Sequence, residues 1–254
     1  MKPEPEFFVG YLDVPPGIGR LMRRCALGLV VGGVALASLL ISRESAFAPA
    51  VFEYGEYREW TGTLLEAPYP RLLVDRPGAA AEGASAHSSF LLGTFGKRGA
   101  GAVVGGLDGR RVSLAGALAY SDAAATLEIE PGSLMDLGAG RVDAALEEDL
   151  GAHQLVGEIL DSKCYSGVMK PGRGKPHRSC SVRCISGGIP PLFIAENSDG
   201  ESVIFLLLDA RGAAPGREIL DWVAKPVRLR GRIHRQGDLR IFQAELDNIA
   251  LQPN

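Results

Sequence analysis

Polar and apolar positions divide the chain into one long apolar block near the N-terminus and a following region of short alternating runs. Residues 25–42 carry no charged side chain, and this block approaches the ~20 apolar residues with which a helix crosses a bilayer. Beyond residue 50, apolar and polar residues alternate over short stretches that end at glycine or proline, which is typical of strands joined by turns. The pattern predicts one transmembrane helix followed by a mostly β region.

Basic residues flank the apolar block unequally. Arg43 alone follows the block closely, whereas four basic residues precede it: Lys2, Arg20, Arg23 and Arg24. Because cytoplasmic flanks are enriched in basic residues, we expect a single-pass inner-membrane protein with residues 1–24 in the cytoplasm and its C-terminal domains in the periplasm. The alternative is a signal peptide cleaved after the small-residue stretch Ala46-Phe47-Ala48, and both interpretations export the same region.

The leader, residues 1–24, places Phe7, Phe8 and Tyr11 among several prolines. This composition favours an extended or turn-rich peptide over a helix. We expect either a solvated tail or an apolar patch that binds the cytoplasmic surface of a protein partner.

The exported region contains an internal repeat. Gly62 aligns with Gly157 at an offset of 95, whereas Gly116 aligns with Gly231 at an offset of 115. A constant offset within each stretch indicates a duplication, and the jump between the offsets predicts an insertion of 20 residues after the first strand of the second copy. Each copy is predicted to begin with a strand whose start is bent and contains glycine. Further strands follow, and a hairpin closes the copy.

This order of elements resembles the oligonucleotide/oligosaccharide-binding (OB) fold, a five-stranded Greek-key barrel. We therefore expect tandem OB-like barrels behind the transmembrane helix. The expected boundaries are 50–131 for the first barrel, 132–152 for a linker with a short helix near 142–150, and 153–254 for the second barrel with its insertion at 162–190.

Candidate chemistry concentrates in the insertion, which holds Cys164, His177, Cys180 and Cys184. Thiolate and imidazole groups suit zinc, and Cu(I) accepts the same ligands with Met169 as a further soft candidate. If Cys180 and Cys184 lie on a helix, they share one face with His177, and Cys164 completes the set from the end of the preceding strand.

Two other interpretations of the cysteines stay open. Exported cysteines tend to oxidise, so a disulfide between Cys164 and Cys180 or Cys184 would staple the insertion. Three exported cysteines always leave one sulfur unpaired, so free or partner-linked thiols are the third interpretation. The charges of Asp161 and Lys163, beside Cys164 at a strand end, are expected to be solvated.

The stretch from the strand at 155–160 through Cys164-Tyr165, the glycine-rich turn, His177-x-x-Cys180, Cys184 and Gly188-x-Pro190 resembles a group of exported bacterial proteins with an OB-like fold. The resemblance covers about residues 155–250. It implies a fold and a site, and it implies no reaction.

The insertion is also basic, since no acidic residue lies between residues 162 and 195. Its candidate partner-binding residues are Lys170, Arg173, Lys175, Arg178 and Arg183. Such a patch attracts an anionic lipid surface, an acidic protein or an anionic ligand, or it is only a solvated loop. We expect no nucleic acid, because base stacking needs aromatic platforms and this segment offers only Tyr165.

The net charge of −3 excludes no class of partner, and no nucleophile elbow, phosphate loop, dinucleotide fingerprint or HExxH motif is present. We therefore expect a non-catalytic accessory or assembly subunit of a membrane complex. A periplasmic zinc- or copper-binding protein is the second hypothesis. A thiol-disulfide enzyme is the third, and the lack of a Cys-x-x-Cys motif disfavours it.

Overall fold

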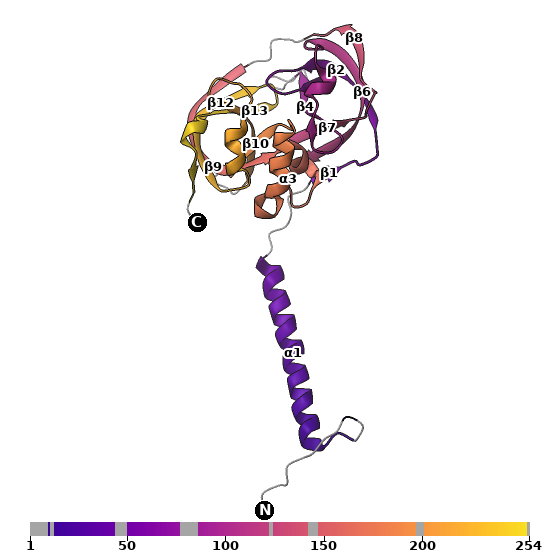
Figure 1. Ribbon diagram of the computed structural model, residues 1–254, viewed down its shortest axis with the longest axis vertical. Helices are drawn as coiled ribbons and strands as arrows, with labels where there is room; N and C mark the ends of the chain where they lie inside the picture. Colours follow the sequence, from indigo (N-terminus) through magenta and orange to yellow (C-terminus); the bar gives the residue numbers. More distant parts are fainter. Residues whose placement is uncertain are drawn as a thin grey trace, which may run out of the picture. The chain divides into compact units, whose positions relative to one another are not determined.

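The computed structural model describes residues 10, 13–43, 50–76, 86–121, 124–141, 147–196 and 201–252. The chain forms two compact units, residues 1–47 and residues 48–254. The N-terminal unit is dominated by helix α1, and the larger unit contains all the strands (Figure 1).

Helix α1 (Pro16–Arg43) is one continuous helix. None of the residues in its 18-residue apolar stretch is buried. Among the described residues it is the one helix long and apolar enough to span a membrane, a property that a signal sequence shares. The expectation of a non-helical leader is wrong from Pro16 onward, because proline suits the first turn of a helix and the following residues join the apolar block. Phe7, Phe8 and Tyr11 lie outside the described residues.

The first barrel closes through five strands. They are β2 (Arg58–Leu65), β3 (Arg71–Asp75), β4 (His87–Thr94), β6 (Arg110–Ser121) and β7 (Ala124–Ile129). The order is β2-β3-β4-β7-β6 and back to β2, with β4 and β7 parallel and the other pairs antiparallel. The short helix α2 (Gly101–Val104) connects β5 to β6. Three short strands extend this sheet: β1 (Ala50–Phe52), β5 (Arg98–Gly99) and β8 (Met135–Ala139).

The second barrel repeats this topology. Its strands are β9 (Glu147–Asp161), β10 (Pro191–Glu196), β11 (Ser202–Asp209), β12 (Val227–Gln236) and β13 (Leu239–Ala244). Here β11 and β13 are the parallel pair, and β12 closes the barrel against β9. The remaining elements are η2 (Arg217–Trp222), η3 (Leu246–Asn248) and β14 (Ala250–Leu251). The predicted fold class is confirmed: a mostly β protein with two closed five-stranded OB-like barrels and an N-terminal apolar helix.

Strand pairing makes the internal repeat visible. Gly62 lies opposite Val112 in the first barrel, and Gly157 lies opposite Val227 in the second. A Cβ atom on Gly62 or Gly157 would lie 2.3 or 2.1 Å from a carbonyl oxygen of the next strand. Both copies therefore need glycine where the first strand crosses closely over its neighbour.

The predicted helix near 142–150 is wrong over Glu147–Leu150, and residues 142–146 lie outside the described residues. β9 already begins at Glu147 and pairs with β12. Acidic side chains there form cross-strand ion pairs, Asp149 with Arg232 and Glu148 with Arg235, which favour the ladder over a helix. The linker therefore ends in a strand that runs directly into the second barrel.

Apolar side chains fill each barrel. Leu64, Leu72 and Leu127 are fully buried in the first, and Phe193, Phe205 and Phe242 pack together in the second. The insertion packs in two places: its Tyr165, Val182 and Ile185 join the core of the second barrel, and its Ile189 forms a separate small cluster with the three cysteines. It connects β9 to β10 through residues 162–190, where the first barrel uses residues 66–70, and it folds into η1 (Cys164–Val168) and α3 (Gly174–Ser186).

Candidate metal centre

Helix α3 positions two of the three cysteines of the insertion. Pro176 lies in its first turn, where proline is tolerated, and Gly187 ends it by donating its N–H to the carbonyls of the last turn. The buried side chains of α3 are His177, Ser181 and Cys184, which recur at helical spacing and face the barrel. The predicted helical spacing of Cys180 and Cys184 is therefore present in the structure.

The three cysteine sulfurs converge. Cys164, just past the end of β9, places its Sγ 3.8 Å from Cys180 Sγ and 3.9 Å from Cys184 Sγ. All three sulfurs lie within 4.8 Å of one another, and none is joined in a disulfide. Cys164 and Cys184 are buried, whereas Cys180 is half-buried and forms the accessible side of the group.

This spacing fits one thiophilic ion. Zinc–sulfur bonds of about 2.3 Å in a tetrahedral site place the sulfurs about 3.8 Å apart. A disulfide needs a sulfur–sulfur distance of about 2.0 Å. The residues can therefore hold a metal, and their thiol chemistry suits both zinc and Cu(I).

His177 lies beside the sulfurs and is not a member of their group. Its Nε2 lies 3.0 Å from Asp161 Oδ2, and both side chains are buried. Asp161 Oδ1 accepts the backbone N–H of Cys164 at 2.8 Å, so the carboxylate links the histidine to the first cysteine. Asp161, His177 and Cys164 form a second group within 4.8 Å. The arrangement orients Cys164, as outer partners of metal ligands do.

Burial and hydrogen bonds shift the pKa values of Asp161, Cys164 and Cys184. Burial works to raise the pKa of Asp161, but hydrogen bonds from His177 and the Cys164 backbone outweigh it and hold the pKa below its usual range. A thiol hydrogen bond to Cys184, together with burial, raises the pKa of Cys164. The same bond lowers the pKa of Cys184. The two thiol shifts have opposite directions because the two sulfurs share this one hydrogen bond.

One lysine at the sulfurs, Lys97, was not predicted. Lys97, from the first barrel, places its Nζ 2.6 Å from Cys180 Sγ and 4.0 Å from Cys184 Sγ. That hydrogen bond raises the pKa of Lys97. Lys97 is 83 residues from Cys180, and no spacing or motif in the sequence joins them.

The expectation of solvated charges beside Cys164 is wrong. The side chains of Asp161 and Lys163 are 0% and 2% exposed. Lys163 forms a buried ion pair with Glu128 and donates to the carbonyls of Thr94 at 2.7 Å and Gly96 at 2.9 Å. Burial is possible because all three ammonium hydrogens have acceptors.

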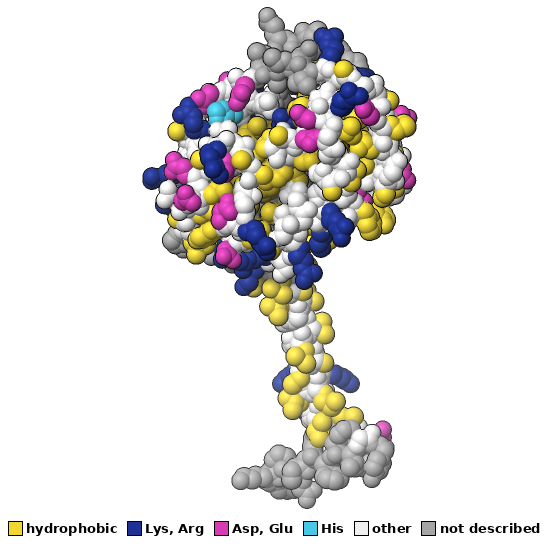
Figure 2. Space-filling view, turned by 45° about the horizontal axis from the view of Figure 1, so that its top comes forward, with side chains coloured by type: hydrophobic (Ala, Val, Ile, Leu, Met, Phe, Trp, Pro, Cys, Tyr) yellow, Lys and Arg dark blue, Asp and Glu magenta, His cyan; other side chains and the backbone are white. Residues whose placement is uncertain are grey.

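The predicted basic patch is only partly open to solvent. Arg173 pairs with Glu196, and Arg178 donates to the carbonyl of Asp221. Lys170, Lys175 and Arg183 are exposed, as is Met169. Figure 2 shows several lysine and arginine side chains gathered at the lower edge of the globular unit in that view.

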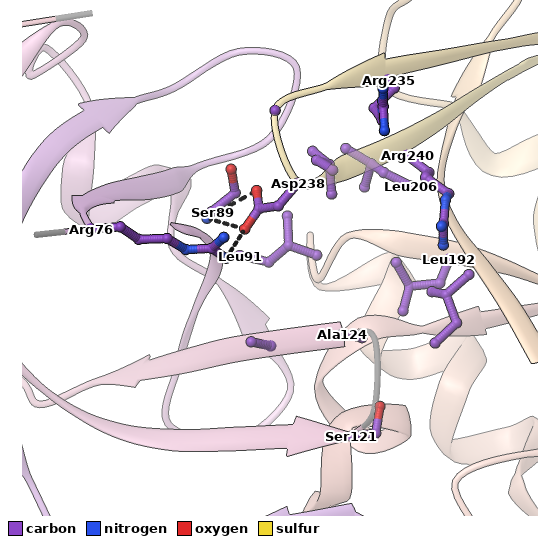
Figure 3. A pocket seen from close by; sticks show the side chains of 14 residues that line it. Arg76, Ser89, Leu91, Ser121, Ala124, Leu192, Leu206, Arg235, Asp238 and Arg240 are labelled. Atoms are coloured by element: carbon purple, nitrogen blue, oxygen red, sulfur yellow. Dashed lines mark hydrogen bonds and ion pairs between the residues drawn. The ribbon is translucent and has the colours of Figure 1, made fainter. Parts of the chain in front are cut away.

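A cavity of about 450 Å³ lies between the two barrels (Figure 3). Arg76 and the N–H of Ser89 both bind Asp238 at one side, and Leu91 and Leu206 form part of its apolar wall. Neither a cysteine nor a histidine is among the residues that line it. The candidate metal chemistry therefore lies elsewhere.

Comparisons with known proteins identify no relative. No family model matches the chain, and neither the curated proteins nor the solved structures contain a match. The resemblance to exported bacterial OB-like proteins stays a prediction.

Proposed function

We propose that the protein is a membrane-anchored, non-catalytic protein that binds one thiophilic metal ion on the exported side of the membrane. Cys164, Cys180 and Cys184 are the proposed ligands, and Asp161 and His177 orient Cys164. The observation that carries the proposal is the sulfur spacing of 3.8 and 3.9 Å, which is that of thiolates sharing one ion.

The composition of the insertion supports the same function. Ordering each residue of a loop costs roughly 1–2 kcal/mol of backbone entropy, and the local apolar cluster of the insertion is little more than the cysteines. Metal–thiolate bonds would add to the packing of Tyr165, Val182 and Ile185 against the core of the second barrel, as they add to folding in small metal-dependent domains. A thiol-disulfide enzyme is less well supported, because the thiols are mostly buried and no Cys-x-x-Cys pair is present.

An accessory or assembly role in a membrane complex is compatible with metal binding. The exposed Lys170, Lys175 and Arg183 support it, since they offer an acidic protein partner a cationic surface beside the site. In that case the ion would shape the insertion that the partner binds.

Metal analysis tests the proposal. The full chain, extracted from membranes in mild detergent, should contain about one zinc or copper ion per chain, because its thiolates fill most of a tetrahedral shell. Cys164→Ser, Cys180→Ser and Cys184→Ser should each lose most of the metal, and Cys25→Ser, in α1, is the matched control. Elemental analysis distinguishes zinc from copper. Metal-free wild type after aerobic and anaerobic purification and after reconstitution with either ion would overturn the proposal.

The competing disulfide predicts a different result. Intact mass measured without reductant would then be lower by two hydrogens, and alkylation would label one exported cysteine instead of three. Metal binding predicts full mass and three thiols that react only after the ion is removed.

A further inference from the structure

Residues 94–99 comprise the end of β4, the turn that follows it and β5, and are called the turn at 94–99 below. This turn lies against the insertion of the second barrel. Two lysines cross this contact in opposite directions. Lys163 reaches from the second barrel into the turn and binds two of its carbonyls, whereas Lys97 reaches from the turn to the sulfur of Cys180. Each barrel therefore supplies hydrogen-bond acceptors to a lysine side chain of the other barrel.

Glycines bring the two backbones into direct contact beside these lysines. The N–H of Gly99 donates to the carbonyl of Gly187 at 2.9 Å. A Cβ atom on Gly187 would lie 1.9 Å from the Lys97 carbonyl oxygen, and one on Gly99 would lie 2.1 Å from the Gly188 carbonyl oxygen. No other residue fits either position without a backbone shift, so the place of Lys97 relative to α3 is set by the main chain.

Charge gives Lys97 a role at the metal centre. Three thiolates and one divalent ion carry a net charge of −1, and uncompensated charge is costly where two of the sulfurs are buried. The Lys97 ammonium, 2.6 Å from one sulfur and 4.0 Å from another, offsets this charge. Among the described cations, Lys97 alone has a contact with the sulfurs, since Lys163 is committed to Glu128.

We propose that Lys97 is a positioning residue of the metal centre, so that the centre is incomplete without the first barrel and ion binding clamps the turn at 94–99 onto the second barrel. This inference rests on the proposed function, namely that the three thiols hold an ion. It adds that the ion joins the two barrels.

Cobalt(II) is a suitable probe, because its thiolate complexes have visible d–d bands and a sulfur-to-metal charge-transfer band in the near ultraviolet. Lys97→Met should weaken Co²⁺ binding by about 10- to 100-fold, the usual effect of removing an outer partner of a metal ligand. It should also move the charge-transfer band to lower energy, because the Cys180 thiolate loses a hydrogen bond. Lys97→Arg should restore most of the affinity.

The matched control is Arg98→Met, which removes a neighbouring exposed cation of the same turn. It should leave both the affinity and the band unchanged. Wild-type affinity and an unshifted band in Lys97→Met would overturn the role of Lys97 while the metal site itself stands. Absence of Co²⁺ binding by the wild type, where Zn²⁺ and Cu(I) also fail to bind, would overturn both.

Hydrogen exchange separates the clamp from the metal site. In the wild-type full chain, Zn²⁺ or Co²⁺ should slow exchange in residues 174–186 and also in residues 94–99 of the other barrel. In Lys97→Met at saturating ion, only residues 174–186 should respond. Protection of α3 without any change at 94–99 in the wild type would refute the clamp and leave metal binding intact.

Discussion

At the residue scale, the least expected feature is a lysine with no access to water. Lys163 follows a strand and precedes a cysteine within a basic segment, so its place in the sequence predicts a solvated side chain. Its burial depends on Glu128 and on two carbonyls of the first barrel, which are far away in the chain. The cysteine group was predictable because its members lie within one local segment. Lys97 and Lys163 were not, because only tertiary contact defines their partners.

Lys163→Met should cost about 3–5 kcal/mol of unfolding free energy, because it leaves the Glu128 carboxylate buried and unpaired. The double variant Lys163→Met/Glu128→Gln should recover a large part of that loss. Urea unfolding of the full chain in detergent reports it through Trp60 in the first barrel and Trp222 in the second. A single variant as stable as wild type, or a double variant no better than the single, would contradict this account.

At the element scale, the insertion is ordered by what surrounds it. The spacing of Cys180 and Cys184 places them on one face if they lie on a helix, and α3 is that helix. The predicted helix near 142–150 fails because Glu147–Leu150 pair with β12, a long-range choice that local composition does not reveal. The turn at 94–99 is held against α3 by glycine contacts on both sides, and glycines of this kind look like ordinary turn residues in the sequence.

Gly99→Ala should therefore be destabilising, by about 1–3 kcal/mol as for other overpacked contacts, because the new Cβ meets the Gly188 carbonyl. Gly101→Ala is the matched control two residues away, where a Cβ meets no atom within 4 Å and the residue begins α2. Unfolding midpoints of the two variants give the comparison. Equal midpoints would mean that the backbone contact is not tight.

The insertion should also be the element that loosens when one sulfur is lost. Cys164→Ser should speed hydrogen exchange in residues 162–190 and leave the core strands of the first barrel unchanged, because Leu64 and Leu72 pack in a separate cluster. Uniformly faster exchange across both barrels would show that the cysteines serve general stability instead of local order.

At the scale of the whole molecule, the repeat offsets predicted two barrels of one topology, and the structure has them. Contact between the barrels had no signature in the sequence, since a duplication specifies each copy and not how the copies pack. Attachment to a membrane depends on α1, the one helix within the described ranges that is long and apolar enough to cross it.

If α1 is retained as an anchor, the mature protein should stay with membranes through high-salt and alkaline washing, because a helix of this length and apolarity inserts too strongly to be extracted. Deletion of residues 1–43 should release it to the soluble fraction. N-terminal sequencing of mature protein that starts at Pro49 would instead identify a cleaved signal peptide.

The tight fit of Gly99 against Gly188 and of Lys97 against Gly187 bears on the ancestry of the two barrels. Copies made by gene duplication begin as interchangeable parts, yet here one copy has acquired the thiol segment and the other the turn that covers it. Neither can be lost, exchanged or shuffled into another gene without breaking a charge pair and a backbone contact. The contact therefore predicts that the two copies are inherited together, and that a substitution at one face is tolerated only with a compensating change at the other.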